Sequence, residues 1–91
     1  MPEKGVGELP LKVGDKGEGV RIVHQQLAAL GYIMQSDKDR DIYDDWTAGK
    51  VKQFQQDQMI RTQNGVYDYY TARAFAQVLD VYRKHWLETS K

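Results

Sequence analysis

The chain has no cysteine among its 91 residues, which excludes disulfide bonds and thiol chemistry. Its two histidines, His24 and His85, are far apart, and no spacing of histidine and cysteine suggests zinc. No apolar run approaches the roughly 18 residues of a membrane-spanning helix, and the first residues lack the apolar segment of a secretory signal. We therefore expect no metal, no cofactor and no membrane insertion.

An excess of charge of one sign is also missing. Thirteen Lys and Arg residues balance thirteen Asp and Glu residues, and the charges are interspersed along the chain. Proteins that bind nucleic acid gain most of their affinity by neutralising phosphates, and adsorption to an anionic membrane needs a basic surface. The composition therefore predicts no nucleic-acid partner and no membrane partner.

The length and the 41% hydrophobic content suit one domain with a single small core. A chain of this size leaves no room for a deep cleft between two lobes. We therefore predict a protein that is not an enzyme and has no catalytic residues.

One pattern occurs twice. Residues 42–48 read Ile-Tyr-Asp-Asp-Trp-Thr-Ala, and 24 positions later residues 66–72 read Val-Tyr-Asp-Tyr-Tyr-Thr-Ala. A repeat of this period indicates one supersecondary unit used twice. In each copy a short extended stretch precedes an aspartate, Asp44 or Asp68, that can cap the following helix.

Apolar spacing places the helices. Val20, Val23, Leu27 and Leu30 share one face of a helix over residues 20–30, and Gly31 is suited to end it. Further helices are predicted over residues 45–59 and 69–87. The predicted core comprises Val23, Leu27, Leu30, Val51, Phe54, Phe75 and Leu79, with His24 as a hydrogen-bonded structural histidine and Trp86 in C-terminal packing.

The fold class is therefore all-α: a small three-helix domain with an internal pseudo-repeat. The extended stretches before the second and third helices either pair with each other as a minimal ribbon or simply pack. We expect residues 1–12 to be a flexible N-terminal tail, residues 13–88 to form the domain, and residues 89–91 to be its C-terminal end.

Two loops have a functional and a plain interpretation. Residues 13–19 are rich in glycine but lack the sequence context of a phosphate-binding loop, so we interpret them as a turn. Asp37, Asp39 and Asp41 alternate as calcium ligands do, but the glycine and glutamate that an EF-hand loop requires are missing. We interpret this segment as a solvated loop.

Three segments, in order, resemble the peptidoglycan-binding domain family. They are the helix from Val20 to Tyr32, the segment Tyr43–Gln55, and the segment Asn64–Phe75, preceded by a glycine-rich lead-in. The resemblance implies a three-helix wall-binding module of the kind found beside peptidoglycan hydrolases, including phage endolysins. The chain departs from the family pattern where Asp44 and Asp68 replace glycines, where bulky residues follow each of them, and where Lys50 replaces a small residue.

Candidate ligand-binding residues cluster at those departures. Trp46, Tyr69 and Tyr70 lie in the first turns of two helices and off the core face, and Lys50, Gln53 and Asp57 share a face directly below Trp46. Exposed aromatics can stack on sugar faces, whereas charged groups suit the stem peptide. The predicted ligand-binding set is Trp46, Tyr69, Tyr70, Asp45, Lys50, Asn64 and Arg73, with the choice between glycan strand and stem peptide left open.

These observations predict non-catalytic binding of cell-wall peptidoglycan that targets an attached or partner hydrolase. The alternative is a protein–protein interaction module on the same fold, in a phage or secretion assembly. Because the chain shows no signal peptide, we expect it to reach the bacterial wall or periplasm by phage lysis or within a larger protein.

Overall fold

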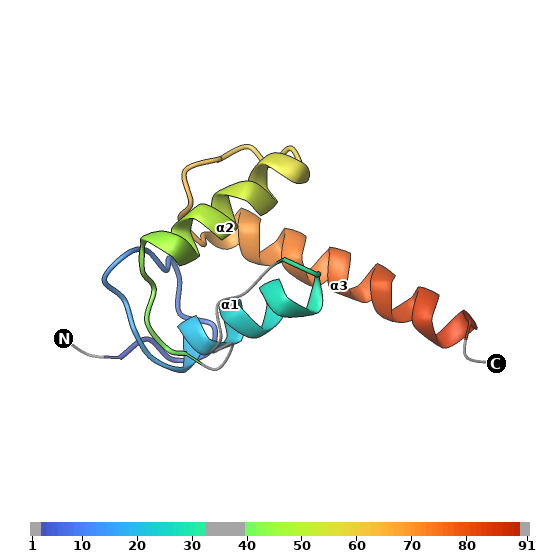
Figure 1. The fold of residues 1–91 in the computed structure, drawn as a ribbon, viewed down its shortest axis with the longest axis horizontal. Coiled ribbons are helices and arrows are strands. Elements are labelled where there is room, and N and C mark those ends of the chain that lie inside the picture. The colour runs from blue at the N-terminus through green and yellow to red at the C-terminus, as the bar shows by residue number, and fades with distance from the viewer. Residues whose placement is uncertain (1–2, 33–39, 90–91) are drawn as a thin grey trace.

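The computed structural model describes residues 3–32 and 40–89, with side chains up to residue 81. Three helices follow one another: α1 (Glu18–Ala29), α2 (Asp45–Asp57) and α3 (Tyr69–Thr89) (Figure 1). Within the described ranges the only β pairing consists of two isolated bridges. The predicted all-α, three-helix fold is confirmed, and every helix boundary lies within two residues of its predicted position.

The first half of α3 lies with α1 and α2, and its second half extends away from them (Figure 1). The molecule is accordingly elongated, with extents of 47 × 27 × 22 Å. Val81, on the extending half, is 67% exposed. Trp86 lies beyond the last described side chain, so its predicted packing stays a prediction.

The repeated sequence forms a repeated structure. Asp44 Oδ1 accepts hydrogen bonds from the backbone N–H and the hydroxyl of Thr47, both at 2.8 Å. Asp68 Oδ1 accepts the same two bonds from Thr71, at 2.9 and 2.8 Å. Each carboxylate satisfies a helix N–H that has no partner within the helix, so both predicted N-caps are confirmed.

The extended stretches before α2 and α3 pair with the N-terminal segment and not with each other. Leu11 and Tyr67 exchange backbone hydrogen bonds of 2.9 and 2.8 Å, and the N–H of Tyr43 donates to the carbonyl of Asp15 at 2.9 Å. Tyr43 and Tyr67 are buried. The N-terminal segment thus supplies the backbone partners that the two buried tyrosines require.

This pairing corrects part of the expected domain organisation. Residues 1–12 were predicted to be a flexible tail, yet Leu11 is only 2% exposed and belongs to the core. The N–H of Lys4 donates to the carbonyl of Lys16, and the carbonyl of Lys4 accepts from Gly19, at 2.8 and 2.9 Å. Residues 4–11 are therefore part of the fold.

The core joins residues of all three helices with the two buried tyrosines. Phe54 stacks on Phe75 with ring centroids 3.8 Å apart. Of the predicted core, Leu30 is only partly buried and Leu79 is half-exposed. The members confirmed as buried are Val23, Leu27, Val51, Phe54 and Phe75, and the buried core also contains Leu11, Val20, Tyr43 and Tyr67.

Candidate functional site

A turn at the end of α1 positions one wall of the candidate site. Gly31 has a φ of 87°, a left-handed conformation that glycine adopts without steric cost. The N–H of Tyr32 donates to the carbonyl of Leu27, and the N–H of Gly31 donates to that of Ala28. These two bonds are the Schellman arrangement. Gly31 thus ends α1 as predicted and directs Tyr32 towards α2.

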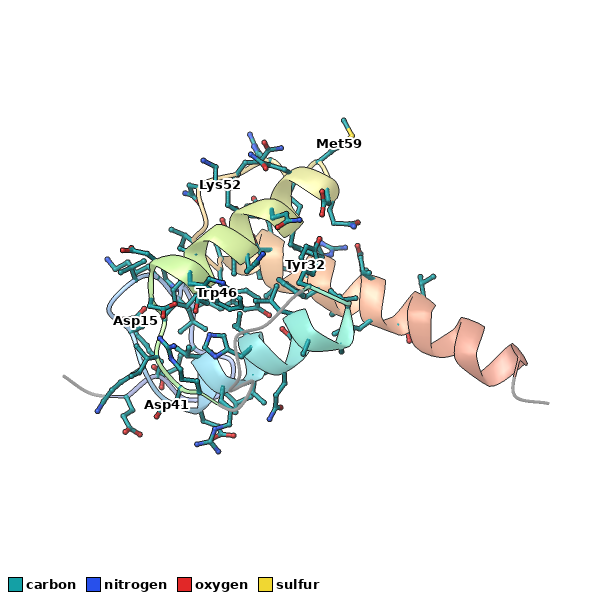
Figure 2. All side chains as sticks on the ribbon, in the orientation of Figure 1. Asp15, Tyr32, Asp41, Trp46, Lys52 and Met59 are labelled. Carbon is teal, nitrogen blue, oxygen red and sulfur yellow. The ribbon has the colours of Figure 1, made fainter. Side chains whose placement is uncertain are left out.

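The other wall is one side of α2. Lys50, Gln53 and Asp57 are spaced three and four residues apart, so they form a row along the helix, as predicted. Tyr32 and Trp46 both lie on the side of α2 that faces α1, whereas Lys52 and Met59 lie on the opposite side (Figure 2).

Between the two walls lies a cavity of about 390 Å³, which we call the α1–α2 hollow. The Tyr32 hydroxyl donates to Asp57 Oδ2 at 2.6 Å and thereby joins the two helices. Burial, together with the hydrogen bond to Asp57 and its negative charge, raises the pKa of Tyr32, so the hydroxyl stays protonated at neutral pH. The lining residues are Leu30, Gly31, Tyr32, Lys50, Gln53 and Asp57.

Trp46 lies at the margin of this row and is half-buried. The Nζ atom of Lys50 lies 5.7 Å from the centroid of the Trp46 ring, a cation–π distance. Among the described residues, Lys50 forms no ion pair. The hollow therefore presents an ammonium group, an amide and a carboxylate in sequence along α2.

The other predicted aromatics form a separate pair. Tyr69 and Tyr70 are 61% and 52% exposed, and their ring centroids lie 5.7 Å apart at 76°. Within the described part of the chain, no ring contact joins either of them to Trp46. The seven predicted ligand-binding residues thus include two aromatic groups, Trp46 and the Tyr69–Tyr70 pair, with no ring contact between them among the described residues.

The remaining predicted residues have different surroundings. Asn64 Oδ1 accepts the N–H of Val66 at 3.0 Å, so this side chain stabilises the turn before α3. Asp45 and Arg73 are exposed. The sequence placed Gln53 and Asp57 below Trp46 without assigning them to the site, and it missed Tyr32. The glycine stop at Gly31 was the available signal for Tyr32.

His24 belongs to the interior, as predicted. Its Nδ1 lies 2.6 Å from the carbonyl oxygen of Arg40 and its Nε2 lies 2.8 Å from Thr47 Oγ1. The side chain is 2% exposed and is shielded from any external ligand.

Gln55 has the same role towards the second copy of the repeat that His24 has towards the first. It follows Val51 and Phe54 at the spacing with which His24 follows Val20 and Val23. Its Nε2 donates to the carbonyl of Val66 at 2.9 Å and to Thr71 Oγ1 at 2.8 Å. The repeat in the sequence did not reveal that Gln55 corresponds to His24. Each of these side chains links its own helix to the first turn of the next helix.

A second, smaller cavity of about 200 Å³ lies where the N-terminal segment meets α1 and the start of α3. It contains none of the predicted ligand-binding residues. The Tyr67 hydroxyl donates to Gln26 Oε1 at 2.8 Å in this region. The cavity is lined by Val6, Gly7, Glu8, Leu9, Leu11, Gly19, Ile22, Gln26, Tyr67 and Ala72.

The described residues contain no group of three His, Cys, Asp or Glu side chains that could hold a metal ion. Asp37 and Asp39 lie outside those residues, so the solvated-loop interpretation stays a prediction. No described helix is long and apolar enough to cross a membrane.

Comparison with known families adds the decisive observation. The model of a family described as "Putative peptidoglycan binding domain" matches residues 16–75. The chain belongs to this family. The matched span contains both capping aspartates of this peptidoglycan-binding domain and all the residues that line the α1–α2 hollow. Neither the curated proteins nor the solved structures searched gave a match.

The cap at Asp44 should make the stability of the domain depend on pH. Desolvation, the largest single influence, raises the pKa of Asp44, but the hydrogen bonds from Thr47 and the charge and hydrogen bond of Arg40 outweigh it and lower the pKa. A carboxylate with a lowered pKa stabilises the fold fully above its unfolded pKa of about 3.9, and this contribution is lost as pH falls through the folded value.

We therefore expect Asp44→Asn to be less stable than wild type at pH 7 and closer to it at pH 3. Asparagine still caps the helix but cannot titrate. Urea denaturation of both proteins at the two pH values measures the difference. A stability gap that is equal at pH 7 and pH 3 would contradict the assigned role of the Asp44 charge.

Proposed function

We propose that this domain binds cell-wall peptidoglycan without catalysing a reaction, and that the α1–α2 hollow is the binding site. The observation that carries the proposal is the position of the hollow inside the span matched by the family. Lys50, Gln53 and Asp57 line the hollow, and the half-buried Trp46 lies beside Lys50. A cavity with a few convergent polar groups is the usual form of a ligand site.

The chemistry of the carboxylates supports a binding role. Asp44 and Asp68 cap helices, and Asp57 accepts the Tyr32 hydroxyl. Each of these three carboxylates therefore has a structural hydrogen bond that accounts for its presence without a catalytic role.

A domain of this kind would act by tethering. Held on the wall, it raises the local concentration of substrate for a hydrolase that is attached to it or bound as a partner. We propose the bacterial wall or periplasm as the place of action, reached by phage lysis, as with an endolysin, or as part of a larger protein.

Co-sedimentation with purified sacculi tests this function. We expect the domain to bind weakly, with a Kd on the order of 10⁻⁴ M, or about −5.5 kcal/mol, and to release no soluble wall fragments. Trp46→Ala should weaken binding several-fold because the indole supports the Lys50 side chain. Tyr70→Ala is the matched control at the equivalent repeat position and should bind as wild type does.

The exposed Tyr69–Tyr70 pair favours one other function, a protein–protein interaction module in a phage or secretion assembly. Tyrosines of this kind are enriched among the residues that anchor protein interfaces. If the domain binds neither sacculi nor soluble wall fragments at millimolar concentration, this function replaces wall binding.

A further inference from the structure

The order of charges along the α1–α2 hollow bears on which part of the wall polymer it binds. Lys50 and Asp57 are seven residues apart on α2, which corresponds to about 10 Å along the helix axis. Gln53 lies between them. An extended peptide advances about 3.3–3.6 Å per residue, so the row matches a ligand whose carboxylate and amine are two to three residues apart.

Lys50 is the cationic end of this row. It is half-buried, lies over the Trp46 ring and has no ion-pair partner among the described residues. A partly desolvated ammonium gains most from a ligand that brings a negative charge, because a charge-assisted hydrogen bond is stronger than one to a neutral group.

Asp57 is the anionic end. Its Oδ2 atom accepts the Tyr32 hydroxyl, and the residue is exposed. The Tyr32 bond fixes the orientation of the carboxylate while leaving its other oxygen available for a ligand amine. The Gln53 side chain, also exposed, can both donate to and accept from a peptide group.

Sugar stacking suits this hollow less well. Stacking requires an open aromatic face, but Trp46 is half-buried and the Lys50 ammonium lies 5.7 Å from its centroid. The sugar ring faces of the glycan would also leave the charges of Lys50 and Asp57 unused.

We propose that the α1–α2 hollow binds the stem peptide of peptidoglycan, with a free peptide carboxylate on Lys50 and a free amine on Asp57. This inference rests on the proposed wall-binding function and specifies its ligand. Gln53 bonds the peptide backbone between the two charged ends, and the glycan strand stays outside the hollow.

A double-mutant cycle on ligand and protein tests the carboxylate contact. The probe is a synthetic stem tetrapeptide with one diamino residue and a free C-terminal carboxylate, and its partner is the same peptide with that carboxylate amidated. For wild type, amidation should weaken binding about five- to tenfold, because it replaces a charge-assisted hydrogen bond by a neutral one. The Lys50→Met variant should bind the free acid about as weakly as wild type binds the amide. It should not discriminate between the acid and the amide. Lys50→Arg should restore the discrimination.

The amine contact has its own cycle. Asp57→Asn keeps an acceptor for the Tyr32 hydroxyl and removes the negative charge. Wild type should prefer the tetrapeptide whose diamino residue has a free amine over the same peptide with that amine acetylated. The Asp57→Asn variant should lose this preference. A urea denaturation curve for each variant confirms that its fold is intact.

The outcomes separate this inference from the proposed function. If sacculi bind wild type but neither peptide does, or if amidation has equal effects on wild type and Lys50→Met, the stem-peptide assignment is overturned and wall binding stands. If an unrelated peptide of the same end charges binds equally well, the hollow is not specific for the wall. If sacculi do not bind at all, the function itself fails.

Discussion

Replacing Phe54 by alanine should lower the free energy of unfolding by about 3–5 kcal/mol, the range observed when a buried aromatic site is emptied. Phe54 is 1% exposed and stacks on Phe75, and the edge of Tyr32 contacts it with ring centroids 6.1 Å apart. Because these contacts join all parts of a small core, the surroundings have little freedom to collapse into the space. Equilibrium urea denaturation at neutral pH measures the loss.

Val81→Ala is the control for this experiment. Val81 is 67% exposed on the extending half of α3, so its truncation should change stability by less than about 0.5 kcal/mol. A loss below about 1 kcal/mol for Phe54→Ala would remove Phe54 from the core. Since Tyr32 packs on Phe54, the alanine variant should also weaken ligand binding in the α1–α2 hollow.

Gln55→Met should be the second most damaging substitution, at about 2–4 kcal/mol, although it conserves the shape of the side chain. Gln55 is fully buried, accepts the N–H of Gly65 at 2.8 Å and donates to the carbonyl of Val66 at 2.9 Å. Methionine leaves both backbone groups without these partners, and each unsatisfied buried group costs about 1–3 kcal/mol. Urea denaturation again provides the measurement.

The matching position on α1 offers a control for the Gln55 substitution. His24 occupies the equivalent position on α1, where its ring nitrogens approach a backbone carbonyl and a threonine hydroxyl, as the Gln55 amide does. His24→Gln should therefore cost less than about 1 kcal/mol. If His24→Gln proves as damaging as Gln55→Met, the two positions are not equivalent.

Local signals were sufficient to predict the helices. An aspartate three residues before a threonine caps α2 and α3, and a glycine in the left-handed conformation ends α1, so each boundary depends on residues adjacent in sequence. The apolar spacing that marks the helices also selected most of the core. These features are set by hydrogen bonds and side-chain periodicity within one or two turns.

The errors concern contacts between residues distant in sequence. The bridge from Leu11 to Tyr67 spans most of the chain, and a segment rich in glycine, proline and charge gave no sign of it. The repeat makes Trp46 and Tyr70 equivalent in sequence, but no ring contact joins them in the described part of the chain. Trp46 instead lies beside Lys50, one turn further along its own helix.

Mapping of backbone amide shifts tests the central claim most directly. Soluble stem-peptide-bearing wall fragments would be titrated into the isotope-labelled domain while the amides and the Trp46 indole are followed. We predict saturable shifts at Gly31, Tyr32, Lys50 and Gln53, with the indole N–H of Trp46 moving in parallel. Shifts confined to Tyr69, Tyr70 and Arg73, or no shifts at millimolar fragment, would contradict a wall-binding site between α1 and α2.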